Sequence, residues 1–166
     1  PDNGLLQYEG GLKKMDDGSF VFQGQGTLYN QTGQSVYQGL WEDGTRSGNG
    51  TAWLEDGSIY SGNWVDDYPD GKGTYLFPDG TEYEGGFIRG KKHGQGTFKE
   101  ADGFVSYDGE WKDGQRFGKG RVNKRDSSSY DGDWLDGKPH GNGMFTYPDG
   151  RVYTGTMKQG LRQGLG

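Results

Sequence analysis

The chain of 166 residues contains no cysteine, has no long apolar run, and is only 28% hydrophobic. Without cysteine it has neither a disulfide framework nor thiolate chemistry, which is compatible with a reducing, cytoplasmic setting. No stretch approaches the roughly 20 apolar residues that a transmembrane helix needs. The low apolar share argues against a thick two-layer core, because ordinary globular domains are about 45–50% apolar when Gly is included.

The chain also lacks the positive charge of a dedicated nucleic-acid binder. Its net charge is −6, and the charge is spread unevenly. Residues 1–84 hold 4 Lys/Arg and 14 Asp/Glu, whereas residues 85–166 hold 14 Lys/Arg and 10 Asp/Glu. Nucleic-acid-binding domains are usually basic, so we expect no nucleic-acid partner. The acidic and mildly basic halves predict two different surfaces.

Glycine and aromatic residues are abundant: the chain has 35 Gly, and 14% of its residues are Phe, Trp or Tyr. Disordered segments are poor in aromatics, so a disordered chain is not expected. Because other apolar residues are few, we expect a thin structure in which aromatic side chains provide most of the buried surface.

A fixed-period repeat organises the sequence. A Tyr-x-Gly pattern begins seven units, at Tyr8, Tyr37, Tyr60, Tyr83, Tyr107, Tyr130 and Tyr153, with spacings of 29, 23, 23, 24, 23 and 23 residues. The first unit carries about six extra residues, and the last is truncated. Such periodicity is the signature of a repeat architecture.

Each unit predicts two short strands and two turns, as residues 107–123 illustrate. The first strand is Tyr107-x-Gly109-x-Trp111, followed by a turn at Asp113-Gly114 with a loop running to Gly118. The second strand is expected to begin at Gly118. Asp-Gly and Pro-Asp-Gly are turn signals because Gly accepts positive φ and Pro presets its own φ. The units therefore predict a meander of about thirteen antiparallel strands.

Strand alternation separates the side chains into two faces. An aromatic face collects the rings with Gly between them, and a polar face collects residues such as Ser61, Glu84, Asp108, Lys119 and Asp133. A ring can lie across a Gly that has no Cβ, which recovers sheet stability that Gly would otherwise lose. Rings of neighbouring strands can then contact one another.

The repeat resembles the MORN (membrane occupation and recognition nexus) family, whose unit of about 23 residues is built on YxGxW, GxxxGxG and a DG turn. The resemblance covers essentially the whole chain. Leu12 and Met157 depart from it by replacing the first-strand aromatic, and Asp126-Ser127-Ser128 lacks the DG turn. The resemblance implies an all-β, elongated, single-layer antiparallel β-meander of about seven hairpin repeats, twisted and grooved. We expect one domain over residues 1–166.

The resemblance also implies a cytoskeletal or ciliary scaffold, a dimer, a partner-binding module, or a phospholipid-binding protein. Some members carry the repeats beside an enzyme domain, so the chain could be a regulatory or targeting region of a larger enzyme. We expect a cytoplasmic protein, with cytoskeletal, ciliary or membrane-peripheral placement as the options that the family offers.

The aromatic face is either simply the core or also a groove for a partner helix or extended segment, since continuous exposed apolar strips usually mark interaction sites. A second copy is another candidate partner, through this face or through the sheet edges. The expected partner-binding residues are Tyr37, Trp41, Tyr60, Trp64, Tyr75, Tyr83, Phe87, Phe98, Tyr107, Trp111, Tyr130, Trp134, Phe145 and Tyr153.

Two basic clusters are either solvated turns and polar strand positions or contacts to anionic lipid or an acidic partner. They comprise Arg89, Lys91, Lys92, Lys119, Arg121, Lys124 and Arg125. Lys and Arg near an anionic membrane contribute about 1 kcal/mol each. The acidic N-terminal half opposes such contact, so we expect weak, salt-sensitive lipid binding at most.

Nothing in the sequence indicates catalysis. There is no metal-ligand set of the right spacing, no marked acid–base pair and no phosphate loop. We therefore expect a non-enzymatic interaction module with no catalytic residues, no metal and no cofactor. A carbohydrate-binding aromatic repeat, in which sugars stack on exposed rings, is the remaining alternative.

Overall fold

A computed structural model describes residues 7–163, and every regular element within them is a β-strand. No helix in this part of the chain is therefore long and apolar enough to cross a membrane. The strands are β1 (Gln7–Lys14), β2 (Phe20–Tyr29), β3 (Ser35–Glu42), β4 (Thr45–Trp53), β5 (Ile59–Val65), β6 (Tyr68–Leu76), β7 (Glu82–Ile88), β8 (Lys91–Lys99), β9 (Val105–Lys112), β10 (Gln115–Asn123), β11 (Ser129–Leu135), β12 (Lys138–Thr146), β13 (Val152–Lys158) and β14 (Leu161–Gln163).

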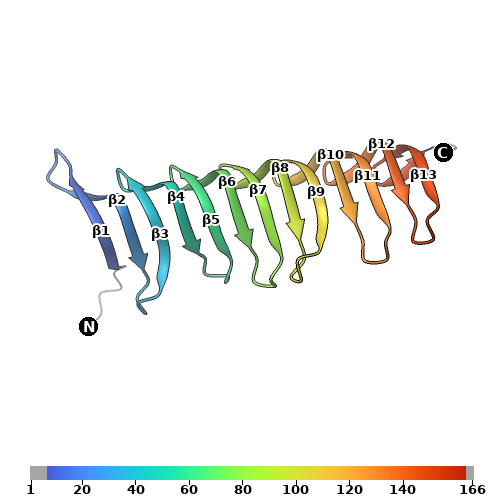
Figure 1. Ribbon diagram of the computed structural model, residues 1–166. Helices are drawn as coiled ribbons and strands as arrows, with labels where there is room; N and C mark the ends of the chain where they lie inside the picture. The colour runs from blue at the N-terminus through green and yellow to red at the C-terminus, as the bar shows by residue number, and fades with distance from the viewer. Residues whose placement is uncertain (1–6, 164–166) are drawn as a thin grey trace. The chain divides into compact units, whose positions relative to one another are not determined.

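The strands follow one another in the sheet in chain order, from β1 to β14, without crossovers (Figure 1). The predicted all-β hairpin meander is confirmed, with 14 strands where about thirteen were expected. Every repeat tyrosine lies in an odd-numbered strand, so each repeat is one hairpin. The expectation of one domain over residues 1–166 stays a prediction.

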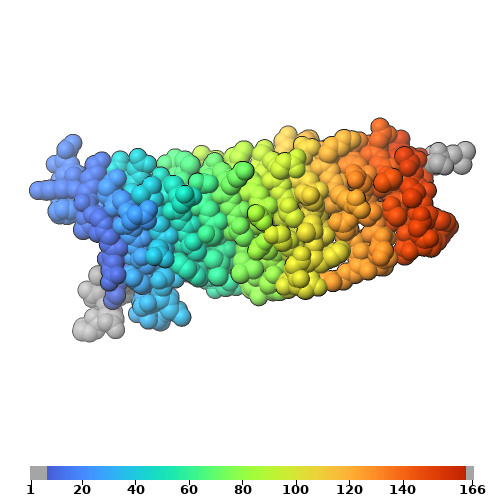
Figure 2. Space-filling model, in the orientation of Figure 1, coloured from blue at the N-terminus to red at the C-terminus, as the bar shows by residue number. Residues whose placement is uncertain are grey.

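The chain divides into two compact units, which are described separately. The first unit contains residues up to 78 together with 87–90, and the second contains residues 79–86 together with 91 onward. Within each unit, successive residues form successive bands across the surface (Figure 2). Each strand therefore packs mainly against the strands next to it in the chain, as in other repeat proteins.

The Asp-Gly turns are tighter than expected. Asp113 and Gly114 have φ values of 50° and 86°, which is the geometry of a two-residue type I′ hairpin turn. Strand β10 starts directly after this turn, at Gln115. The predicted loop running to Gly118 is wrong, because a β-bulge rather than a loop accommodates Gly118.

The bulge lies where the GxG pattern begins. Trp111 pairs with Arg116 and Gly109 pairs with Gly120, so three residues of β10 face the single residue Glu110. The middle residue of the three, Gly118, has a positive φ of 59°. The carboxylate of Glu110 accepts a hydrogen bond of 2.9 Å from the amide of Lys119, so it satisfies a donor inside the bulge. The pairings β3–β4, β5–β6 and β11–β12 carry register shifts at the same place.

The turns that join one repeat to the next are closed by Asp side chains, or by Asn30 after the first repeat. In the turn without Gly, Ser127 takes a positive φ of 68°, and the carboxylate of Asp126 accepts a hydrogen bond of 2.9 Å from the amide of Ser128. The amide of Lys124 donates to the carbonyl of Ser128. The departure from the DG pattern therefore leaves the turn intact.

The core consists of rings lying over Gly on one face of the sheet. Tyr107 is fully buried, and a Cβ added at Gly120 would overlap its hydroxyl. That hydroxyl donates to the carbonyl of Glu110, opposite the bulge, at 2.9 Å. Tyr107 contacts Trp111 edge to face, with ring centroids 5.1 Å apart. The indole of Trp111 in turn donates to the carbonyl of Gly96 in the preceding repeat, at 3.0 Å.

The two atypical terminal units fill their cores differently. Leu12, which stands at a ring position, is exposed. Phe22 stacks on Tyr8 instead, with centroids 3.8 Å apart, and its ring contacts Trp41. Met157 takes the ring position of the last unit and is buried. Both departures leave the hairpin pattern unchanged.

Replacing Trp111 with Ala should lower the free energy of unfolding by about 3–5 kcal/mol, because it removes a buried ring and a buried indole hydrogen bond. Urea denaturation followed by fluorescence measures the change. The matched control is Lys119→Glu with Arg121→Glu on the polar face: Lys119 makes an exposed ion pair with Asp133, which contributes about 0–1 kcal/mol. Unfolding of the charge-reversed control would show that the two faces are assigned wrongly.

Because several tyrosines are buried, we expect the free energy of unfolding to fall at alkaline pH. Burial raises the pKa of Tyr37, Tyr83, Tyr107 and Tyr130 to about 12, whereas an unfolded Tyr has a pKa of about 10. The folded state holds these protons more tightly, so the stabilisation is complete below pH ~10 and is lost as the pH rises towards 12. Tyrosinate absorbance, with and without urea, measures this difference. If all 11 tyrosines of the folded chain titrated together near pH 10, the prediction would fail.

Candidate functional site

The fourteen expected partner-binding residues differ in how deeply they are buried. Ten are buried in the core: Tyr37, Trp41, Tyr60, Trp64, Tyr83, Phe87, Tyr107, Trp111, Tyr130 and Trp134. The other four, Tyr75, Phe98, Phe145 and Tyr153, are half-buried. The ten buried rings therefore hold the hairpins together, and the four half-buried rings remain partly accessible. Partner binding by either group stays a prediction.

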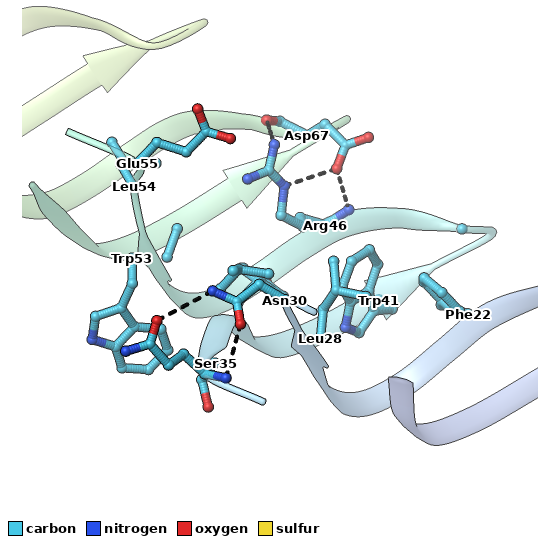
Figure 3. Close-up of a pocket in the computed structure, with 15 residues that line it drawn as sticks. Phe22, Leu28, Asn30, Ser35, Trp41, Arg46, Trp53, Leu54, Glu55 and Asp67 are labelled. Carbon is cyan, nitrogen blue, oxygen red and sulfur yellow. Dashed lines mark hydrogen bonds and ion pairs between the residues drawn. The ribbon is translucent and has the colours of Figure 1, made fainter. Parts of the chain in front are cut away.

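The aromatic face of the first unit is hollowed into a groove of about 970 Å³. Ala52 lies in register between Tyr37 and Tyr60, where the second strands of later repeats carry a larger residue, namely Tyr75, Phe98, Val122 or Phe145. Ala52 supplies only a methyl group at this position, and it is 1% exposed although it lines the groove, so the hollow extends over the side chains around it. Phe22, Leu28 and Trp41 contribute apolar wall, and Asn30, Gln34, Trp53 and Glu55 also line the groove (Figure 3).

An ion pair also lines this groove. Arg46 of β4 pairs across the hairpin with Trp41, and its guanidinium lies 4.2 Å from the ring centroid of Trp64. Asp67, in the turn between β5 and β6, accepts hydrogen bonds of 2.9 Å from both the amide and Nε of Arg46. The Nη2 group donates to the Asp67 carbonyl, also at 2.9 Å (Figure 3). Arg46 therefore has its ion-pair partner, Asp67, within the first unit.

Two further cations lie on the aromatic face; the sequence reasoning named Lys92 without its face and missed Arg116. Lys92 places its Nζ 4.9 Å from the Trp111 centroid and 5.1 Å from that of Tyr83. The Arg116 guanidinium lies 4.7 Å from the Tyr107 centroid. The available signal was alternation: Arg116 is two and four residues before the two Gly of its GxG motif, and it shares their face once the strand is extended back to the turn.

The seven residues of the basic clusters do not share one surface. Within the second unit, Lys119 and Arg121 lie on the polar face, whereas Lys92 lies on the aromatic face. Lys91 precedes Lys92 in strand β8, so alternation places it on the polar face. Lys119 pairs with Asp133, and Arg125, in the turn beside Lys124, pairs with Asp102 at 2.7 Å. Arg89, in the first unit, lies over the ring of Tyr68. Anionic lipid contact by these residues stays a prediction.

No set of three or more metal-ligating side chains is clustered within residues 7–163. His93 and His140 occupy the same repeat position, ahead of the GxG pattern, and lie on separate strands, β8 and β12. In the described residues, the rings, the groove and several cations thus lie on the aromatic face of the sheet. This arrangement suits binding of a side chain or a segment of another protein.

Comparison with known families identifies the repeat. Six segments match the MORN repeat, namely residues 37–59, 60–82, 83–104, 107–123, 130–150 and 153–166. No curated protein matches the chain. MORN repeats are non-catalytic modules that generally mediate protein or membrane interaction. The matched segments begin at the same tyrosines as the hairpins of the structure and together cover most of residues 37–166. The chain therefore belongs to the MORN-repeat family.

Proposed function

We propose that the protein is a non-enzymatic interaction module that binds a helix or extended segment of a partner protein on its aromatic face. The groove lined by Ala52 carries this proposal, because it is an open, largely apolar space on a face where Tyr37, Trp41, Tyr60 and Trp64 are buried. Its volume of about 970 Å³ accommodates several side chains of a segment. Arg46 and Asp67 add a fixed polar contact that can orient it.

Two alternatives have less support. Sugars stack on exposed ring faces, but Tyr60 and Trp64 are 1% and 3% exposed and pack edge to face against each other. A lipid surface needs cations gathered on one side, whereas Lys92 and Lys119 lie on opposite faces. A peripheral, lipid-binding placement is therefore the second choice, and co-sedimentation with anionic vesicles at physiological salt tests it.

Filling the groove should abolish segment binding without unfolding the sheet. Ala52→Phe introduces the side chain that Phe98 and Phe145 provide in other repeats, so the hairpin should accept it. Peptides selected from a random display library on the wild-type chain would be measured by fluorescence anisotropy. We expect Ala52→Phe to lower the affinity for these peptides at least about tenfold, because the ring occupies the space that the peptide would use.

The matched control is Thr51→Phe, which adds the same ring one residue earlier in β4, on the polar face. It should leave peptide affinity within about twofold of wild type. Thermal melting verifies that both chains are folded. If the peptides then bound wild type and Ala52→Phe with equal affinity, the groove would not be the binding site. Sedimentation velocity of the free chain shows whether a second copy occupies this face instead.

A further inference from the structure

The charged side chains that line the groove of the first unit are not equally paired. Among the described residues, three charged side chains line it, those of Arg46, Glu55 and Asp67. Arg46 donates three hydrogen bonds to Asp67, and its guanidinium lies over the ring of Trp64. The one cation of this lining is therefore already paired and is not available to an acidic ligand.

Both carboxylates of the lining can accept further contacts. Glu55 is exposed and makes no ion pair within the part of the chain that the structure describes (Figure 3). Asp67 uses Oδ1 for both hydrogen bonds that its carboxylate accepts from Arg46, and its side chain is 44% exposed. Its Oδ2 accepts no hydrogen bond from residues 7–163. One cation and two carboxylates thus give the lining a net charge of −1 and leave acceptor oxygens unused.

The two carboxylates lie beyond opposite ends of strand β5. Glu55 is in the turn between β4 and β5, and Asp67 is in the turn between β5 and β6. Each has an exposed acidic neighbour in the sequence, Asp56 and Asp66 respectively. Strand β5 has 7 residues, which corresponds to a length of about 20 Å. Negative charge is therefore placed at two separated points of the groove rather than at one.

The uncharged part of the lining is largely apolar. Trp53 and Leu54 are 37% and 38% exposed, and Phe22, Leu28 and Trp41 add further apolar surface. Covering such surface with apolar side chains of a partner is favourable because it removes the surface from water. A ligand that matches this lining therefore combines apolar side chains with positive charge on either side of them.

We propose that the groove of the first unit binds a partner segment in which apolar residues are flanked by Lys or Arg. This inference rests on the proposed function and adds the chemistry of the segment. One cation pairs with Glu55, and the other pairs with the Asp66–Asp67 turn. A separation of about 20 Å corresponds to about six residues of an extended segment or about 13 residues of a helix. An acidic segment would meet like charge at both points.

The test removes charge at the groove with little change in its shape. The neutralised variant, Glu55→Gln with Asp66→Asn, loses one carboxylate at each end and keeps the ion pair of the groove. Asn tolerates the positive φ of 48° at position 66. The matched control, Asp16→Asn with Glu42→Gln, removes the same charge from exposed residues of the first unit that do not line the groove.

The probe is a displayed library of random peptides that is selected on wild type. Only peptides whose affinity Ala52→Phe lowers are analysed further, which confines the readout to the groove. We expect these peptides to contain Lys and Arg beside apolar residues more often than the unselected library does.

The neutralised variant should bind these peptides about fivefold more weakly than wild type, because two exposed ion pairs are lost. The control should stay within about twofold of wild type, which separates contacts at the groove from general attraction to a chain of net charge −6. Raising the NaCl concentration from about 0.05 to 0.5 M should weaken binding to wild type more than binding to the neutralised variant. Thermal melts verify that each variant is folded.

Two results would overturn this inference and leave the proposed function in place. One is a set of groove-dependent peptides with no excess of Lys and Arg, and the other is equal affinity of these peptides for the neutralised variant and the control. If Ala52→Phe weakened none of the selected peptides, the proposed function would fail, and this inference would fail with it.

Discussion

The contact of a tyrosine ring with the bare backbone of facing glycines is the interaction on which the sheet depends. Gly109 and Gly120 pair directly, and the ring of Tyr107 covers them so closely that a Cβ at either would overlap it. In a single-layered sheet, such rings provide most of the apolar burial that opposes the entropy of so many glycines. Tyr37, Tyr60, Tyr83 and Tyr107 are almost fully buried, so these positions are committed to folding and cannot vary to suit a partner.

The β-bulge follows from the same packing. The tyrosine hydroxyl needs an acceptor, and the bulge leaves the carbonyl of Glu110 opposite three residues of the next strand, where the Tyr107 hydroxyl reaches it. Glycine in the left-handed region makes the bulge possible. Because the bulge adds an even number of residues, alternation continues through it, and Arg116 emerges on the aromatic face. Rings, bulge and cation are therefore one arrangement repeated in successive hairpins.

Much of this fold could be predicted from the sequence, because period-two alternation and Asp-Gly turns are local signals. These signals correctly placed Tyr107 and Trp111 on the aromatic face and Lys119 on the polar face. The strand start at Gln115 did not, since GxG reads equally well as a loop or a bulge until pairing is known. Lys92 was grouped with its neighbour Lys91 as one basic cluster, although adjacent strand residues point to opposite faces. The groove was also missed, because a hollow at Ala52 depends on the walls that neighbouring strands supply.

Because the rings and glycines are committed to folding, the repeats differ on the aromatic face mainly at positions outside these contacts. The residue paired with the first-strand ring is Arg46 in one hairpin, Pro69 in the next, Arg116 further on and then Pro139. The turn residue that faces it is Asp67 in one repeat and Gly in the others. A change at either position alters the charge of the aromatic face without touching the ring–glycine contacts. The same hairpin framework thus carries an arginine in an ion pair in the first unit and, among the described residues, an arginine without an ion pair in the second.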